Sequence, residues 1–300
     1  MYYAVYALFY LLSLLPFWIL YLLSDSFYLL AFYIIRYRRQ VVYNNLLIAF
    51  PEKSHEERQE IAKAFYHNLI DSFLESIKLL TLSEAALLKR TSCNFDLIAR
   101  LAAEGKDIQF QPGHQFNVEF YNLLYSSRIK EFAFVFVYMP ISNKIIDRIF
   151  YKVRSRFGSI LVAATQFREQ KKLFEGTQYG ITLGADQNPS YIQGAFWMNF
   201  FGKPAPFLPG PANTAVKKNT AIVLVEFIKV KRGYYHFKNT LLTKDASANE
   251  PKQLTRAYRD YIEGNIKRHP SNYLWTHKRW KHEFKDEYHH LWSDDISLER

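Results

Sequence analysis

The sequence predicts an α/β fold, with a mainly parallel central sheet flanked by helices and a hydrophobic helical membrane anchor at the N-terminus. Residues 1–24 carry no charged side chain, β-rich runs alternate with helical stretches from about residue 107 onward, and apolar residues make up 49% of the 300-residue chain. Strands that alternate with helices are typical of βαβ units and parallel sheets. The apolar content suffices for a folded core, so disorder is not expected.

The N-terminal segment predicts an uncleaved membrane anchor. The first charged residue is Asp25, residues 27–35 are again uncharged, and a cluster of arginines lies within residues 36–39. Residues 3–23 reach the length of about 20 apolar residues that a spanning helix needs, with a kink expected at Pro16. The segment lacks the positive start and the small-residue cleavage site of a signal peptide. The alternative is a hydrophobic hairpin that is buried in the fold or lies in the plane of the membrane interface.

The charge of the chain favours anionic partners. The formal net charge is +11, and a basic surface attracts nucleic acid, anionic lipid or acidic carrier proteins. No zinc-finger spacing, RNP-like signature or long basic helix is present, so we expect a membrane partner and no nucleic acid. Because cytoplasmic segments of membrane proteins are rich in Lys and Arg, the arginines within residues 36–39 predict a body on the cytoplasmic side.

Cysteine and histidine usage gives no sign of a disulfide, a metal or another cofactor. Cys93 is the single cysteine, so no intramolecular disulfide can form, which fits a reducing compartment. Cys93 has no surrounding signature, and we interpret it as structural. The histidines from His236 onward lack the spacing to carboxylates or cysteines that metal sites have.

Residues 36–90 are expected to be helical. Ser54 followed by Glu57 is typical of a capping box at a helix start. Apolar residues then recur at i, i+4 spacing and predict one buried stripe for core packing: Ile61, Phe65, Leu69, Phe73 and Ile77.

The rest of the chain predicts alternating strands and helices. The expected strands are 107–111, 131–139, 159–163, 179–185, 220–230 and 234–239, and the expected helices include 142–156, 165–175 and 251–269. The last two strands should form a hairpin across residues 231–233, because Gly233 provides the turn.

The segment QFQPGHQFNVEF holds the candidate catalytic pair, His114 and Glu119. On one helix the two side chains would point about 140° apart. They can cooperate only if His114 lies in the turn after the strand and Glu119 in the first turns of the next helix. A carboxylate bound to one imidazole nitrogen leaves the other free to accept a proton. With no Ser or Cys nucleophile nearby, this pair suits direct general-base attack by a hydroxyl or amine on an activated acyl group. The alternative is a capping pair at a turn.

Four segments together resemble one enzyme family. GHQFNVE at 113–119, ADQNP at 185–189, FFGKPAPFLPGPANTAVKKNTAIV at 200–223 and YLWTHKRWK at 273–281 follow in the family's order and spacing. By these segments the chain is similar, over nearly its whole length, to the late acyltransferases of lipid A biosynthesis, the lauroyl/myristoyl acyltransferase family.

The resemblance implies a membrane anchor over residues 1–35 and a glycerolipid-acyltransferase-like domain over 36–300. It implies an acyl carrier protein thioester as donor, with acyl-CoA left open, and a hydroxyl of a lipid A precursor as acceptor. It places the reaction at the inner face of the cytoplasmic membrane, with the catalytic domain in the cytoplasm. No cofactor is implied.

The resemblance also implies residue roles. His114 matches the general base and Glu119 its partner, and Asp186 matches a supporting acidic residue in the substrate site. The segment at Gly210 is expected to hold an anion at a helix start, and Lys278 and Arg279 to meet phosphate groups. Without the resemblance, Asp186 could equally cap a turn, and residues 277–281 could be a solvated basic face.

One departure bears on the acceptor. The family often has Tyr-Arg-Pro where this chain has Tyr138, Met139 and Pro140, so Arg154 and Arg156 are expected to replace the missing arginine. Two further hypotheses therefore stay open: a family member acting on an aminolipid or glycolipid, and a catalytically silent protein that binds lipid or carrier protein. A thioesterase is a minor alternative.

Overall fold

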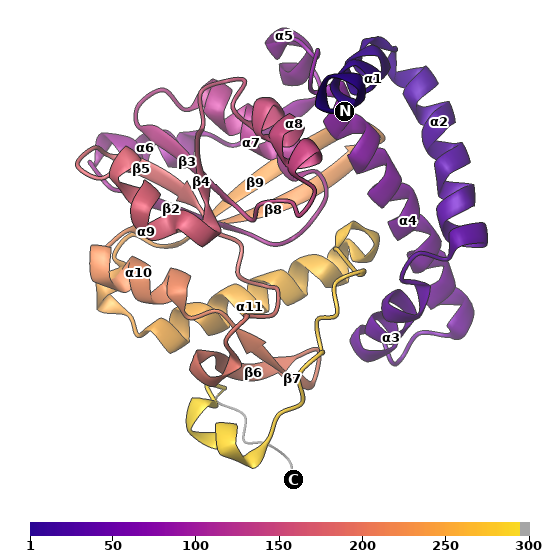
Figure 1. The fold of residues 1–300 in the computed structure, drawn as a ribbon. Helices are drawn as coiled ribbons and strands as arrows, with labels where there is room; N and C mark the ends of the chain where they lie inside the picture. Colours follow the sequence, from indigo (N-terminus) through magenta and orange to yellow (C-terminus); the bar gives the residue numbers. More distant parts are fainter. Residues whose placement is uncertain (295–300) are drawn as a thin grey trace.

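The computed structural model of the chain describes residues 1–294. Its centre is a seven-stranded sheet in the order β1-β9-β8-β2-β5-β3-β4 (Figure 1). Within this sheet β8 and β9 pair antiparallel and the other neighbouring strands pair parallel, so the expected mainly parallel sheet is confirmed. The strands are β1 (Thr91–Cys93), β2 (Ile108–Pro112), β3 (Ala133–Tyr138), β4 (Ile160–Ala163), β5 (Tyr179–Thr182), β8 (Ala221–Lys231) and β9 (Tyr234–Thr243).

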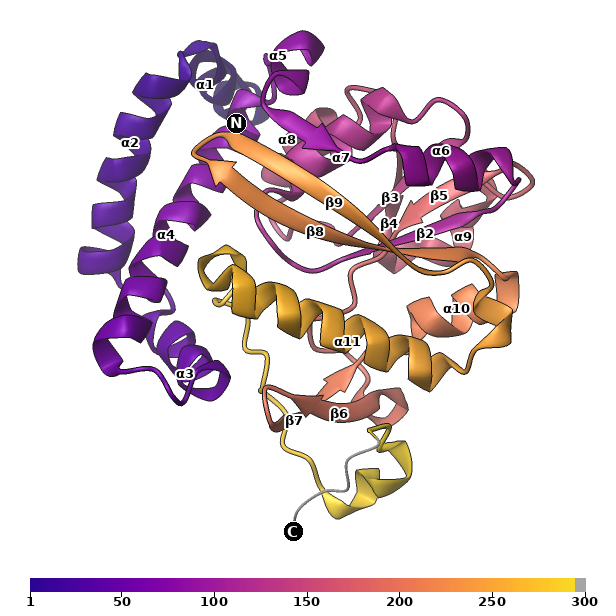
Figure 2. The ribbon, with the colours of Figure 1, turned by 180° about the vertical axis from the view of Figure 1, so that it is seen from behind.

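Helices cover both faces of this sheet (Figures 1 and 2). One apolar cluster joins Phe110 and Val223 of the strands to Leu101 of α6 (Asp96–Ala103) and Tyr121 of α7 (Val118–Arg128). Buried residues of α5 (Glu84–Leu88) and α8 (Lys144–Arg154) belong to the same cluster. The opposite face, including Ile222, packs against α10 (Gly210–Lys218) and α11 (Pro251–Arg268). The short helix α9 (Phe167–Gln170) follows β4.

A second, two-stranded sheet was not predicted. β6 (Phe196–Phe200) and β7 (Lys203–Phe207) form an antiparallel hairpin whose turn residues Phe201 and Gly202 both have positive φ. Trp197, Met198 and Phe200 are fully buried. The hairpin packs against α11, away from the main sheet, so the alternation of strands and helices gives no sign of it.

The N-terminal region is a bundle of helices on one side of the sheet. It comprises α1 (Tyr2–Leu14), α2 (Phe17–Leu29), a π-helical extension (Leu30–Ile35), α3 (Arg39–Ala49) and α4 (His55–Lys78). The capping box at α4 is confirmed, because Glu57 N donates to Ser54 Oγ and Ser54 N donates to Glu57 Oε2.

The expected single helix over residues 3–23 is wrong. The chain leaves helical geometry at Leu15, since Pro16 supplies no N–H and excludes the helix from the preceding residue. The helix whose length and apolar composition would let it cross a membrane is instead Phe17–Ile35, of 19 residues.

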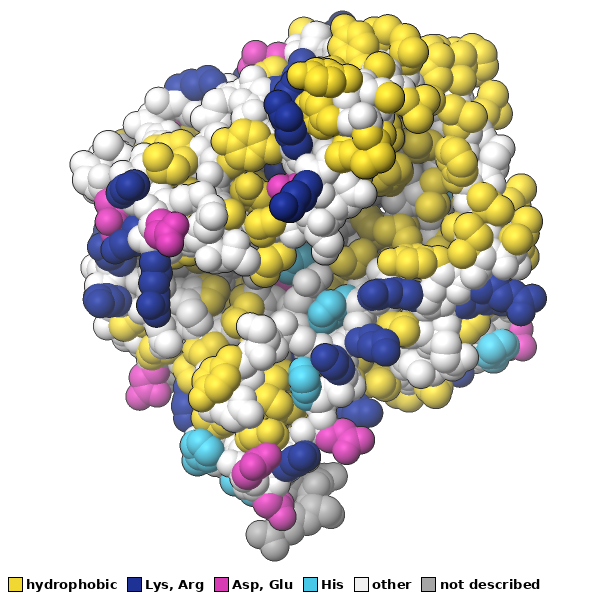
Figure 3. All heavy atoms as spheres, in the orientation of Figure 1, with side chains coloured by type: hydrophobic (Ala, Val, Ile, Leu, Met, Phe, Trp, Pro, Cys, Tyr) yellow, Lys and Arg dark blue, Asp and Glu magenta, His cyan; other side chains and the backbone are white. Residues whose placement is uncertain are grey.

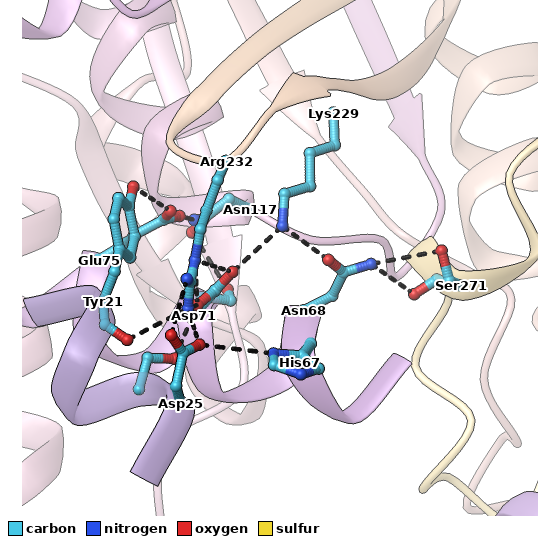
Figure 4. Close-up of polar contacts among 12 residues, drawn as sticks. Tyr21, Asp25, His67, Asn68, Asp71, Glu75, Asn117, Lys229, Arg232 and Ser271 are labelled. Atoms are coloured by element: carbon cyan, nitrogen blue, oxygen red, sulfur yellow. Dashed lines mark hydrogen bonds and ion pairs between the residues drawn. The ribbon is translucent and has the colours of Figure 1, made fainter. Parts of the chain in front are cut away.

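Ion pairs centred on a buried carboxylate hold α2 against the body of the protein (Figure 4). Arg232, in the turn between β8 and β9, bridges Asp25 of α2 (2.6 Å) and Asp71 of α4 (2.7 Å). Lys229 also binds Asp71 at 3.2 Å, and Ser24 donates to Asp71 at 2.7 Å. The Asp71 side chain is only 2% exposed, so its charge depends on these partners.

One turn further along α4, Glu75 extends this polar cluster toward the sheet. Its carboxylate accepts hydrogen bonds from Tyr21 of α2 (2.9 Å), Tyr235 of β9 (2.6 Å) and Asn117, the residue before α7. Burial raises the pKa of Glu75 to about 7, against the hydrogen bond from Tyr235. The apolar N-terminal helices are therefore an integral part of the fold.

We predict that Arg232→Gln lowers the free energy of unfolding by about 2 kcal/mol, because it leaves the buried Asp71 with Lys229 as its only cationic partner. Denaturant-induced unfolding measures this. The matched control is Lys244→Gln, which removes an exposed pair with Glu104 and should cost less than about 0.5 kcal/mol. Equal losses in the two variants would contradict this role of Arg232.

Candidate active site

His114 lies in a tight loop at the carboxyl end of β2, where parallel sheets place their sites. β2 ends at Pro112, and α7 begins at Val118. The C-terminal segment holds the loop from the other side: Leu274 N donates to the His114 carbonyl at 3.1 Å, and Phe116 N donates to the Asn272 carbonyl at 3.3 Å. Two regions far apart in the sequence thus fix the position of His114.

Asp186 is the carboxylate that binds His114. Its Oδ1 lies 2.6 Å from His114 Nδ1, and its Oδ2 accepts the His114 backbone N–H at 2.9 Å. Tyr258 of α11 donates to the same carboxylate at 3.2 Å. Asp186 is fully buried, whereas the His114 side chain is 37% exposed. The imidazole is therefore anchored through Nδ1 and presents Nε2 outward.

Within the His114–Asp186 pair, the surroundings favour the ionised form of the Asp186 carboxyl. Burial opposes its ionisation, but the His114 charge and hydrogen bonds outweigh burial and hold the pKa of Asp186 at about 2. Burial likewise disfavours the His114 imidazolium, but the Asp186 charge outweighs it, so the pKa of His114 lies above its usual value. A raised pKa makes the neutral imidazole a stronger base, but it also increases the fraction that is already protonated near neutral pH.

Two glycines make room for this arrangement. A Cβ on Gly113 would lie 2.8 Å from the Ile262 side chain, and a Cβ on Gly184 would lie 3.2 Å from His114 Cε1 and 3.5 Å from the Pro112 carbonyl. The imidazole packs against the backbone after β5 because residue 184 has no side chain.

Glu119 does not bind His114, which corrects the expected hydrogen-bond partner of the imidazole. In the described residues 1–294, Glu119 instead forms a bidentate pair with Arg154 of α8, at 2.6 to 3.1 Å. Both side chains are nearly buried, and Arg154 stacks 5.2 Å from the ring of Tyr138. The spacing of His114 and Glu119 gave the right neighbourhood, but the choice of carboxylate depended on a residue 72 positions away.

The other expected substrate-binding cations lie elsewhere. Arg156 donates to the Leu79 and Leu82 carbonyls at the end of α4. Arg279 is fully buried and donates to Asn188 Oδ1 (3.2 Å) and the Pro206 carbonyl (2.9 Å). The Lys278 side chain is exposed, and its carbonyl accepts from Asn188 Nδ2.

A cavity of about 1320 Å³ opens beside His114. It crosses one face of the sheet, between the α9 region and α10, and reaches the amino ends of β2 and β8. Gly184, Gln187, Asn188 and Gly210 line it with His114. Its apolar wall is made by Val137, Tyr138, Met139, Phe167, Phe174, Ile181 and Leu183. Lys217 and Lys218 lie at its rim, where Asp107 and the Lys171–Glu175 ion pair also lie.

Several site residues carried no recognisable sequence signal. Tyr258 supports Asp186 from α11 and also donates to the Pro112 carbonyl at 2.8 Å, yet its position in the helix resembles any core tyrosine. Gln109, also fully buried, lines the cavity with an Oε1 that has no hydrogen-bond partner in the described part of the chain. A polar residue inside a strand that otherwise reads as apolar was the one available hint.

The geometry suits proton abstraction at the edge of a large cavity. Nε2 of His114 has no partner within residues 1–294, and the described residues hold no cluster of His, Cys, Asp or Glu that could bind a metal ion. An oriented imidazole beside an apolar cavity with lysines at its rim can deprotonate one group of a large, partly anionic substrate.

Comparison with known proteins gives one match. The model of the family described as "Bacterial lipid A biosynthesis acyltransferase" matches residues 1–282. No curated protein matches the chain.

We predict that Asp186→Asn lowers the pKa of His114, because burial persists while the opposing negative charge is lost. Titration of the imidazole by NMR, with the signal assigned through His114→Gln, measures this. Glu104→Gln, which removes an exposed carboxylate paired with Lys244, is the control and should leave the titration of His114 unchanged. An unaltered His114 pKa in Asp186→Asn would show that the carboxylate does not act on the imidazole.

Proposed function

Because the chain belongs to the bacterial lipid A biosynthesis acyltransferase family, we propose that it moves a fatty acyl chain from an acyl thioester to a hydroxyl of a lipid A precursor, with His114 as general base. Family membership makes the chain an acyltransferase with an acyl donor and a lipid acceptor. The observation that carries the proposal is the hydrogen bond between His114 and Asp186. The Nε2 atom of His114 has no hydrogen-bond partner among residues 1–294, and His114 lines the cavity.

In the proposed reaction, His114 Nε2 takes the proton of the acceptor hydroxyl as its oxygen attacks the thioester carbonyl. The charge of Asp186 stabilises the imidazolium that forms. The tetrahedral intermediate then collapses, the C–S bond breaks, and the imidazolium returns the proton to the leaving thiolate. The Gln187 side chain lines the cavity and has no protein partner within residues 1–294, so it can donate to the oxyanion.

Glu119 is proposed to act through the structure of the loop. Its pair with Arg154 ties the first turn of α7 to α8, and that turn directly follows the loop that carries His114. Losing either partner would leave the other charge buried and unpaired. Glu119 is thus a positioning residue beside the catalytic His114.

The cavity fits both ends of such a substrate. Its apolar wall suits an acyl chain, and Lys217 and Lys218 suit an anionic group of the donor or acceptor. An acidic carrier protein would be drawn to a chain of net charge +11. We propose the carrier thioester as donor and the cytoplasmic face of the inner membrane as the place of reaction.

A second acceptor class has an observation in its favour. Arg154, Arg156 and Arg279 are bound to protein groups, and Met139 borders the cavity where the family often has arginine. Fewer arginines are available for phosphate, which favours an aminolipid or glycolipid acceptor in the same reaction. A silent binding protein has no need of the His114–Asp186 pair.

His114→Ala should reduce acyl transfer by about 10²–10⁴-fold, the usual contribution of a general base. Purified protein, acyl carrier thioester and extracted lipid acceptor are assayed by mass spectrometry of the product, with unfolding measured in parallel. His290→Ala, an exposed histidine, is the control. Near-normal transfer by His114→Ala would overturn the assignment of the base.

Mass spectrometry of total lipid from cells with and without an intact copy identifies the acceptor. We expect lipid A to lose one secondary acyl chain. Loss of one chain from another lipid would assign the aminolipid or glycolipid alternative, and an unchanged lipid profile would contradict both.

A further inference from the structure

The first helices expose a continuous apolar surface, which we call the N-terminal apolar face. It includes Tyr3, Leu11, Trp18, Leu22, Ile34 and Ile35, each between 59% and 80% exposed. Hydrophobic side chains gather over α1 and α2 in the space-filling view (Figure 3). Only 22% of the apolar window within Phe17–Ile35 is buried. Exposed apolar surface of this extent marks an interaction site.

The opposite side of the same helices is held by polar groups. Asp25 and Ser24 of α2 bind Arg232 and Asp71, and Tyr21 binds Glu75 (Figure 4). If α2 crossed a bilayer in this conformation, α4 and the β8–β9 turn would enter the hydrocarbon beside it. The charges of that cluster would then lose contact with water, at a large cost.

Helix length also argues against crossing by α1. Its 13 residues extend about 20 Å, less than the hydrocarbon thickness of about 30 Å. A helix pair that is apolar on one side and bound to protein on the other fits a position along the surface of one leaflet.

Basic side chains border both ends of the N-terminal apolar face. Arg148 and Lys152 of α8 lie 4.3 and 4.5 Å over the rings of Tyr2 and Tyr6, and Arg36 is exposed at the other end. Asp25, the one acidic residue of α1 and α2, is paired with Arg232. The border is complementary to anionic lipid headgroups.

We propose that the N-terminal apolar face inserts into one leaflet of an anionic bilayer in the membrane plane, and that neither α1 nor α2 crosses it. Met139, which borders the cavity, lies in the loop leading to α8, and α8 contacts α1. Docking by this face brings that edge of the cavity toward the lipid. The proposal concerns membrane binding and is independent of turnover.

Cysteine labelling tests the topology. In the full chain with Cys93→Ser, single cysteines replace Tyr3, Leu15 or Gln40, which lie in the first turn of α1, between α1 and α2, and in the first turn of α3 after the π-helical extension. Right-side-out and inverted membrane vesicles are treated with a membrane-impermeant maleimide. One side of the membrane gives labelling of Gln40→Cys. We expect that neither Tyr3→Cys nor Leu15→Cys is labelled from the other side. Labelling of either from that opposite side would overturn the proposal.

Vesicle binding tests the lipid partner. The purified full chain should float with phosphatidylethanolamine vesicles that contain phosphatidylglycerol, and more weakly with phosphatidylcholine vesicles. Arg36→Gln and Arg148→Gln should each weaken anionic binding about five-fold, as expected for one cation near an anionic surface. Lys244→Gln, on an exposed pair with Glu104, is the control. Equal binding to both vesicle types, or no effect of either arginine variant, would overturn the anionic partner.

Discussion

The buried carboxylate of Asp186 is the interaction on which the site depends. It binds the backbone N–H and the ring of His114 together, so one residue sets both the path of the loop and the orientation of the imidazole. A buried charge is stable only when several donors satisfy it. Tyr258 from α11 completes the set, and the glycine at residue 184 lets the ring come close enough.

The segments that resemble the family's motifs meet around this carboxylate but have different physical roles. His114 borders the cavity, whereas Arg279 is buried and orients Asn188 and the β7 backbone. The backbone of residues 272–274 holds the loop of His114. A cationic motif can therefore be essential to a site without touching a substrate, because an Arg buried among carbonyl and amide oxygens fixes the segments that supply them.

Hydrogen bonds connect the N-terminal helices to the site. Tyr21 of α2 and Asn117, just before α7, bind the same Glu75 carboxylate. Asn117 lies between His114 and Glu119 in the chain, so the loop contacts α4 through Glu75, and α4 in turn contacts α2, which carries part of the N-terminal apolar face.

The sequence alone determined the α/β class, the capping box of α4, the β8–β9 hairpin and the family, because these rest on local patterns or on motifs within single segments. It also identified His114, which a strand followed by Pro112 and Gly113 places at a strand end. It could not identify Asp186 as the partner of His114 in place of Glu119, or the pairing of Arg154 with Glu119. It also placed the helix of spanning length at residues 3–23 instead of Phe17–Ile35. The choice of partner among several carboxylates and arginines is made by long-range packing of β2, β5 and α11, which brings together side chains that no local spacing connects. Whether apolar helices cross a membrane is likewise decided by tertiary contacts, since Asp25 and Tyr21 gain their partners only when the β8–β9 turn and α4 pack against α2.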